Sequence, residues 1–478
     1  MNLPSTVLRA SRHGKTGRQV AAACAIAAVG GFDLLFRLGA PDWSTDELAY
    51  RDSGWSSFHG GSFLANPEHP PLAKHIVGVF EILFGRSETP VRMSAVVAGV
   101  LTGVFLALIA RRVAGNWAAL ATAAVWFALP HPADLKLERF ALLDVFMAMF
   151  TTLAILCVVH WSVSRTWRWV VATGIAVGLA TACKLPGALA YAPVGVFVVV
   201  RGRFSVRSWL QLSALTAAGV GAFVAAYIPA VRQMPHQVGY MIAFQGRQRT
   251  QGHPVLVGGH VYRHPPWWTQ LRWQWDASWV LALCYLAVVV FAVVIARRDP
   301  DMALLVGVLV TTFGFFAFVS GNILGQYPYA WAPVLAVITG LTLREMAGRG
   351  GLVRVGALVI ALALVVPAAQ LIVRTASIRR TDYAAAAELL RARVGPAPSV
   401  VVVGYGDVLL AYLPRCRLVR DTARVVATAV VFDPEVADRR AIGRDSKFLA
   451  AHPLEFSGHR IGRLTVYLPS APGPATHP

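Results

Sequence analysis

Residues 46–74 read DELAYRDSGWSSFHGGSFLANPEHPPLAK, a polar stretch between an apolar run at 20–40 and another at 90–110. Each flanking run has about the 20 residues that a helix needs to cross a hydrocarbon core. The stretch therefore predicts a loop outside the membrane between two spans. Its acidic pair and its Pro-Pro-Leu-Ala-Lys cluster make this loop the first candidate for a site of chemistry.

Similar apolar runs recur along most of the chain. Of its 478 residues 56% are hydrophobic and only 14% are charged, whereas soluble domains carry about 25% charged residues. The fold class predicted is an all-α polytopic membrane protein of about 11 transmembrane helices with a small C-terminal extracytoplasmic α/β domain. The eleven candidate spans lie at 20–40, 90–110, 114–130, 140–160, 168–183, 185–200, 208–230, 277–296, 302–320, 328–343 and 353–373.

The distribution of charge predicts the orientation in the membrane. If the basic segment 1–19 is cytoplasmic, short loops on that side collect the arginines, while acids such as Asp42, Asp46, Glu47 and Glu68 fall on the other side. This is the positive-inside pattern, and it accounts for the net charge of +20 without nucleic acid as a partner. We expect a multi-pass protein of the cell (inner) membrane, whose first span is retained rather than cleaved.

The spans divide the chain into a transmembrane domain at 20–373, with outer loops at 41–89 and 231–276, and an outer tail at 375–478. The tail has the composition of a helix at 382–393 and of a buried strand at 399–403. Weaker strand patterns follow near 425–432 and 464–468. A small α/β domain is predicted there; Gly404 and Gly406 after the strand are a weak nucleotide signal, because the third glycine and a matching acid are missing.

Two interpretations of Asp46 and Glu47 are open. Adjacent carboxylates near a bilayer surface raise one another's pKa, and such a group can act as general base toward a hydroxyl. Alternatively, the pair lies in a solvated loop or at a helix N-terminus capped by Ser44 or Thr45.

The segment Glu68-His69-Pro70-Pro71-Leu72-Ala73-Lys74 predicts the start of a helix, because prolines favour the first turn. Lys74 then lies in that turn, where it could bind a phosphate. The alternative is a rigid loop that enters an interfacial helix, with a snorkelling lysine. The helix, ending near Gly85, is too short and polar to span.

Charged residues also lie at the outer ends of predicted spans. Asp144 falls inside an apolar run five residues after Arg139, and Lys184 lies between two spans. Ionisable groups in such places indicate function, and a structural ion pair is the rival interpretation. Asp33 and Arg37 are four residues apart and are expected to pair on one helix face.

The second outer loop contains His253, Trp267 and Trp268. Tryptophans gather at membrane interfaces whatever the function, so an aromatic belt is the default interpretation. The histidines lack the compact spacing of a zinc site. A divalent ion shared with the acids of the first loop is left open.

Together these motifs resemble those of multi-spanning glycosyltransferases that use polyprenyl-phosphate sugars, a group that includes protein O-mannosyltransferases and lipid A aminoarabinose transferases. The resemblance is carried, in chain order, by Arg37, Asp46-Glu47-x-x-Tyr50, His69-Pro70-Pro71-Leu72-x-Lys74, Arg139-x-x-x-Leu143-Asp144, Lys184-x-Pro186-Gly187, Gly252-His253-Pro254 with the Pro-Trp-Trp stretch, and Tyr327-Pro328-Tyr329.

The resemblance implies transfer of a sugar, mannose or another hexose or pentose, from a polyprenyl phosphate to a hydroxyl of a protein, lipid or cell-wall glycan on the outer face, with inversion. It implies no certain cofactor; a divalent cation at Asp46, Glu47 and His253 is possible. Asp46 is implied as the base, with Glu47 beside it. Lys74, Arg92, Arg139 and Lys184 are implied for the donor phosphate, and Tyr50, Glu68, His69, Asp144, His253, Trp267, Trp268 and Tyr327 for substrate binding.

Two other classes are weighed against the enzyme. A non-enzymatic transporter or flippase of polyprenyl-linked lipids explains the spans and the basic residues, but transporters place critical charges near the midplane, and here they fall at the outer boundary. A structural membrane subunit predicts that the acids of the first loop can be replaced without loss.

Overall fold

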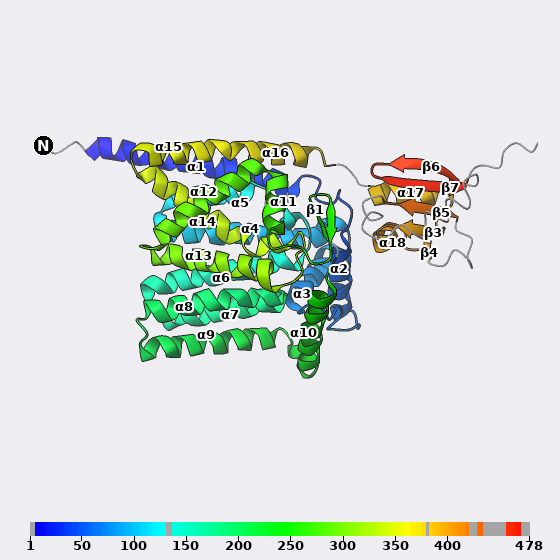
Figure 1. The fold of residues 1–478 in the computed structure, drawn as a ribbon, viewed down its shortest axis with the longest axis horizontal. Helices are drawn as coiled ribbons and strands as arrows, with labels where there is room; N and C mark the ends of the chain where they lie inside the picture. Colours follow the sequence, from blue (N-terminus) through cyan, green and yellow to red (C-terminus); the bar gives the residue numbers. More distant parts are fainter. Residues whose placement is uncertain are drawn as a thin grey trace, which may run out of the picture. The chain divides into compact units, whose positions relative to one another are not determined.

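The computed structural model describes residues 5–130, 136–253, 255–378, 382–419, 428–433 and 456–469. The chain divides into two compact units. The first comprises Met1–Phe36 and Tyr50–Ser377, and the second comprises Arg37–Ala49 and Ile378–Pro478. Figure 1 shows the first unit as long helices that lie side by side and the second as a small sheet with two helices.

Within the described residues of the first unit, seven helices are long and apolar enough to cross a membrane. They are Gly17–Leu35 of α1 (Ser5–Leu35), α4 (Glu88–Ala114), α6 (Leu143–Ser164), α9 (Val206–Ala225), α12 (Trp279–Ala296), Pro300–Val319 beginning with α13 (Pro300–Gly314), and Gly351–Ala376 covering α15 (Gly351–Ala363) and α16 (Val365–Ala376). The predicted helical, multi-spanning character is confirmed, and the number eleven stays a prediction.

Shorter apolar helices occupy the remaining predicted spans. They are α5 (Asn116–Ala128), α7 (Trp167–Cys183), η2 (Leu185–Ala190) with α8 (Tyr191–Arg201), and α14 (Ala332–Gly348). α6 is the most enclosed of the seven long helices, with 83% of its apolar window buried, against 17% for α1. The face of α6 that carries the candidate residues is therefore surrounded by other helices.

Glycines allow α7 and α9 to approach closely. A Cβ atom at Gly174 would lie 2.2 Å from the carbonyl oxygen of Leu215, and one at Gly178 would lie 2.1 Å from that of Gly219. Small residues four apart are the usual means by which membrane helices pack backbone against backbone. This contact fixes the turn after α7, in which Lys184 lies.

The first outer loop folds into α2 (Thr45–Phe58) and α3 (Leu72–Phe84). α3 begins directly after Pro71, as the Pro-Pro pair predicts. The two helices cross at Gly54 and Gly78, where a Cβ on Gly78 would lie 2.6 Å from the carbonyl oxygen of Gly54. α3 exposes Ile82, Leu83 and Phe84, which is the pattern of a helix that lies in an interface.

The second outer loop contains η3 (Ile228–Gln233), α10 (Met234–Gln251), a hairpin of β1 (Val255–Val257) and β2 (His260–Tyr262), and α11 (Thr269–Ala277). The hairpin is antiparallel, with Leu256 opposite Val261. Further along, η4 (Phe315–Val319) ends the apolar segment begun by α13, and η5 (Tyr327–Ala330) precedes α14.

The second unit contains the predicted α/β domain. A sheet in the order β4-β3-β5-β7-β6 is formed by β3 (Ser399–Val403), β4 (Arg417–Leu418), β5 (Ala429–Phe432), β6 (Phe456–Ile461) and β7 (Leu464–Pro469), with α17 (Asp382–Arg393) and α18 (Gly406–Tyr412). β3 runs parallel to β4 and β5, and β7 runs antiparallel to β5 and β6. The predicted helix at 382–393 and strand at 399–403 are confirmed.

The glycine after β3 has a structural cause. A Cβ at Gly404 would lie 2.4 Å from the hydroxyl of Tyr383. That hydroxyl donates to Asp433 Oδ2 at 3.0 Å and accepts from the backbone N–H of Tyr405 at 2.9 Å. The space that a phosphate would take in a nucleotide loop is filled by a tyrosine, so the nucleotide signal has no support.

Candidate functional site

The acidic pair forms the first turn of α2. The backbone N–H of Ser44 donates to Glu47 Oε2 at 3.0 Å, and the N–H of Glu47 donates to Ser44 Oγ at 3.1 Å. This reciprocal arrangement is a capping box, so the predicted capped helix N-terminus is confirmed. Glu47 is fully buried in it, whereas Asp46 is half-buried, which makes Asp46 the better candidate for a base.

Lys74 is buried and anchors the loop before α3. Its Nζ donates to the carbonyl oxygens of Ala65 at 2.9 Å, Asn66 at 2.7 Å and His69 at 2.9 Å. These bonds use all three donors of an ammonium group. Burial lowers the pKa of Lys74 to about 7, and the charge of Glu68 opposes that shift. The contacts are those of a loop-anchoring lysine, and a role with the donor phosphate stays a prediction.

His69 is held at the centre of several contacts. Its ring meets that of Tyr50 edge-on, with 6.0 Å between centroids. Its carbonyl accepts from Lys74 and, at 3.2 Å, from Nε2 of Gln237 in α10. Burial, followed by the charges of Lys184 and Lys74, lowers the pKa of His69 well below its usual range. A neutral imidazole has one ring nitrogen that donates a hydrogen bond and one that accepts.

Asp144 and Lys184 form a buried ion pair. Nζ of Lys184 lies 2.8 Å from Oδ1 and 2.7 Å from Oδ2 of Asp144, and it lies 4.7 Å from the ring centroid of Tyr327. The sequence left a structural ion pair open for each residue without naming its partner. The pair found joins the start of α6 to the turn after α7, beside Tyr327 of η5. The structure thus brings Asp144, Lys184 and Tyr327 together, and the charge of Lys184 also contributes to the lowered pKa of His69.

Two arginines lie buried near the outer end of α4. Arg139, in η1 (Leu137–Arg139), donates to the carbonyls of Asp33 at 2.7 Å and Phe36 at 2.8 Å. It thereby satisfies carbonyl groups at the end of α1. Burial, with the charge of Arg92, lowers the pKa of Arg139 to about 10, so the Arg139 guanidinium group remains charged at pH 7. The guanidinium of Arg92 lies 5.2 Å from the ring centroid of Phe140.

The predicted pairing of Asp33 with Arg37 is wrong. α1 ends at Leu35, and Arg37 follows in a left-handed conformation with φ of 49°. The two residues therefore do not share a helix face. Arg37 instead donates from Nη1 to the carbonyl of Ile378 at 2.9 Å.

The predicted site residues of the second outer loop contact other parts of the protein than the residues described above. The N–H of His253 donates to the carbonyl of Arg263 at 2.8 Å. Trp267 is 49% exposed and stacks on Phe318, and Trp268 meets Tyr262 edge-on. These exposed rings fit the aromatic belt that the sequence suggests, and their roles in substrate binding stay predictions.

No group of three or more His, Cys, Asp or Glu side chains that could hold a metal ion occurs among the described residues. A divalent cation therefore stays an expectation from the sequence.

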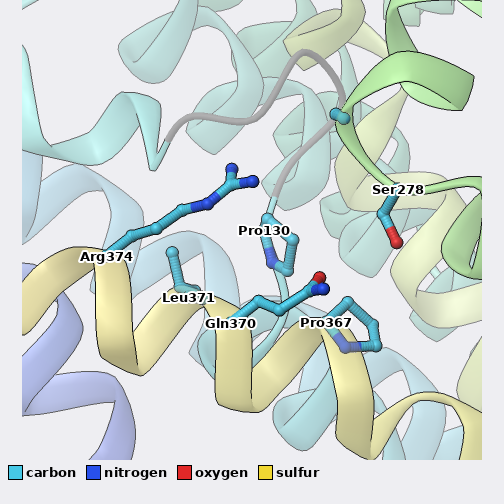
Figure 2. A pocket seen from close by; sticks show the side chains of 7 residues that line it. Pro130, Ser278, Pro367, Gln370, Leu371 and Arg374 are labelled. Atoms are coloured by element: carbon cyan, nitrogen blue, oxygen red, sulfur yellow. The ribbon is translucent and has the colours of Figure 1, made fainter.

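One small cavity is lined by α16 and the segments that face it. Figure 2 shows Pro367, Gln370, Leu371 and Arg374 on one helix, with Pro130 and Ser278 across from them. Its volume of about 10 Å³ is room for one water molecule, so this cavity is too small for a sugar.

Sequence reasoning missed two residues of the site. Gln237 is 2% exposed and links the second outer loop to the first through the His69 carbonyl; a buried amide in a polar loop gives no pattern that reveals its partner. Lys136 is buried and donates from Nζ to the carbonyl of Trp126 at 2.5 Å. The sequence does place Lys136 three residues before Arg139, and this proximity could have indicated that Lys136 lies near the site.

Comparison with known proteins agrees with this geometry. Residues 68–229 match the family described as dolichyl-phosphate-mannose-protein mannosyltransferase. Two polyprenol-phosphate-mannose–protein mannosyltransferases of Mycolicibacterium smegmatis strains are similar. One is 28% identical over 209 residues, which are 37% of this chain and 40% of the relative. The other is 31% identical over 141 residues, 28% of this chain and 27% of the relative. The chain thus matches less than half the length of these curated relatives.

Solved structures share the fold over almost the whole chain. ArnT from Cupriavidus metallidurans bound to undecaprenyl phosphate superposes with a TM-score of 0.64 at 18% identity, covering 95% of this chain and 98% of that one. The oligosaccharyltransferase AglB from Archaeoglobus fulgidus gives 0.53 at 14% identity, covering 97% and 75%. The chain therefore has the fold of these membrane glycosyltransferases, and the resemblance to polyprenyl-phosphate-sugar-dependent transferases that its motifs indicate is confirmed.

Proposed function

We propose that this protein is a membrane glycosyltransferase that moves a sugar from a polyprenyl phosphate to a hydroxyl acceptor on the outer face. The observation that carries the proposal is the family match at residues 68–229, because that segment contains His69, Lys74, Arg139, Asp144 and Lys184. Lys74, Arg139, Asp144 and Lys184 are among the buried charged groups of the structure, and His69 is half-buried. Mannose is the first sugar to test, because both similar relatives are named for polyprenol-phosphate-mannose.

The chemistry requires one base and positive charge near the leaving group. Asp46 takes the proton of the acceptor hydroxyl while the hydroxyl oxygen bonds to the anomeric carbon of the sugar. The bond from that carbon to the phosphate oxygen breaks, and the polyprenyl phosphate leaves with the electron pair. A single displacement inverts the anomeric centre. Arg92 and Arg139 supply buried positive charge, which is most effective where water is excluded, and Lys184 lies in its ion pair with Asp144.

The capping box distinguishes the two acids. Glu47 stabilises the start of α2 through Ser44, so its amide analogue keeps the cap, since Glu and Gln both serve at this position. Asp46 lies one residue earlier and is half-buried. Replacing Asp46 removes the base, and replacing Glu47 by Gln tests for a chemical role without removing the helix cap.

The test uses the purified full chain in lipid with radiolabelled polyprenyl-phosphate sugars and peptide, lipid and glycan acceptors. We expect transfer by the wild type, a loss of at least about 100-fold in Asp46→Asn, and near wild-type transfer in Glu47→Gln. Donor binding should be unchanged in both variants. Equal turnover of wild type and Asp46→Asn removes Asp46 from the mechanism, and donor binding without transfer or hydrolysis favours a lipid transporter.

A further inference from the structure

Two turns at the far end of α6 from the candidate site bring arginines together. Arg165 ends α6, and Arg201 ends α8. Arg165 Nη1 donates to the carbonyl of Arg201 at 3.0 Å, and Arg207, at the start of α9, donates from Nη2 to the carbonyl of Arg165 at 3.5 Å. These bonds cross-link the α6–α7 turn to the α8–α9 turn.

The arginines carry more positive charge than their surroundings offset. Arg201 and Arg203 both act electrostatically on Arg165, and burial together with these two charges lowers the pKa of Arg165. Asp301 faces the group from α13 and acts on both Arg165 and Arg201. Neighbouring Asp299 accepts from the N–H groups of Asp301 and Met302 and so caps α13. Asp301 therefore interacts with two of the four arginines, and Arg112 also acts on this carboxylate.

One donor of this group has no partner. Nε of Arg201 is buried and makes no hydrogen bond to any described residue. A buried guanidinium donor without an acceptor is costly. An anion bound beside these arginines would offset their charge.

The backbone holds the arginines in an unusual conformation. Arg165, Arg203 and Phe204 have φ values of 55°, 57° and 54°. They are three of the five described non-glycine residues with positive φ, so this region concentrates backbone strain. Strain of this kind collects where a local geometry serves a function.

The surroundings are those of a lipid interface. Phe204, Val206 and Trp209, beside the arginines, are 65%, 76% and 51% exposed. Exposed apolar and aromatic side chains next to guanidinium groups can contact acyl chains while the charges meet headgroups.

We propose that Arg165, Arg201, Arg203 and Arg207 form a binding site for the phosphate of an anionic membrane lipid. Guanidinium groups bind phosphate oxygens in pairs of parallel hydrogen bonds. The site is separate from the sugar-transfer site, because the 22 residues of α6 place about 30 Å between Asp144 and this end. The phosphate can belong to a glycerophospholipid or to a polyprenyl phosphate, and the two share this chemistry.

The test measures lipid retention by the full chain. The protein is incubated in detergent with phosphatidylglycerol, phosphatidylcholine or a polyprenyl phosphate, and bound lipid is counted by native mass spectrometry. The variant is Arg201→Gln/Arg207→Gln, which keeps the backbone carbonyl that Arg165 uses. The matched control is Arg297→Gln/Arg298→Gln, two exposed arginines of the α12–α13 turn, which removes the same charge.

We expect the wild type to retain phosphatidylglycerol over phosphatidylcholine, and the variant to lose about tenfold in that affinity while the control changes about twofold or less. Displacement of phosphatidylglycerol by polyprenyl phosphate in the wild type assigns the site to the carrier lipid; the lack of displacement assigns it to phospholipid. Equal losses in variant and control, or equal retention of phosphatidylcholine, overturn the proposal. Melting curves of both variants show whether either change affects folding.

Discussion

Two lysines lie buried in the membrane unit, and they are held in different ways. Lys74 is 2% exposed and donates to three backbone carbonyls of its own loop. Lys184 is 5% exposed and faces both oxygens of a carboxylate that comes from a helix 40 residues earlier in the chain. One lysine closes a local turn, and the other joins three distant segments.

The difference bears on how each lysine could bind the phosphate of the sugar donor. Carbonyl oxygens are neutral, so the cage around Lys74 leaves a net positive charge in a buried place, and the pKa of Lys74 falls to about 7. Asp144 balances the charge of Lys184 directly. An arriving phosphate would have to compete with three carbonyl oxygens at Lys74, whereas at Lys184 it would have to compete with both oxygens of the Asp144 carboxylate. The positive charge that is held by neutral carbonyl oxygens rather than by a carboxylate is therefore that of Lys74, and the roles of both lysines toward the donor phosphate stay predictions.

The largest expected effect follows from breaking the ion pair. Lys184→Met leaves Asp144 buried and without its partner, and we expect it to lower the free energy of unfolding by about 3–5 kcal/mol. Thermal melts in detergent measure this loss. The double variant Asp144→Leu/Lys184→Met removes both charges and should regain most of the stability. If the double variant is no more stable than the single one, the pair does not act as a unit.

A smaller effect is expected at the other lysine. Lys74→Met removes three charge-assisted hydrogen bonds, but the carbonyls belong to a loop that can admit water. We expect a loss of about 2–3 kcal/mol. Protection of the amides of residues 65–69 from hydrogen exchange should fall together with the melting temperature. Unchanged protection there would show that the cage does not hold the loop.

Local sequence patterns predicted the parts of this molecule that local interactions determine. The proline pair set the start of α3 at Leu72, and the run of valines set β3. The contacts of the two lysines were harder to predict from the sequence. The cage of Lys74 depends on a left-handed turn at Asn66, with φ of 53°, which no pattern in the sequence indicates.

Long-range contacts were predicted least well. For Asp144 and for Lys184 a structural ion pair was left open without a named partner, because only the packing of α6 against α7 brings these two residues together. Gln237 was missed, since its partner is a carbonyl 168 residues away. The pairing of Asp33 with Arg37 failed because the end of α1 at Leu35 leaves Arg37 outside the helix.

The pH dependence of stability separates the two lysines further. The folded state holds Lys74 with a pKa of about 7, against a value of 10.5 without burial. Between pH 7 and 10 the unfolded chain therefore binds more protons at this residue, and stability rises with pH. We expect the stability of the wild type relative to Lys74→Met to increase by about 1–2 kcal/mol from pH 7 to pH 9. Melts of both proteins at each pH measure this. A difference that stays flat, or that decreases, contradicts the lowered pKa.

The smallest expected effect concerns the link between the outer loops. Gln237 donates one hydrogen bond to the His69 carbonyl, which Lys74 also holds, so Gln237→Leu should cost only about 1 kcal/mol of stability. If the amide positions His69 for the donor, KM for the polyprenyl-phosphate sugar should rise severalfold with kcat nearly unchanged, since the lost contact acts on binding. Gln237→Glu keeps the size of the side chain but loses the donor, so it should resemble Gln237→Leu. If Gln237→Glu has the KM of the wild type, the size of the side chain and not its hydrogen bond determines donor binding. The hydrogen bonds of Lys74 alone then hold the loop.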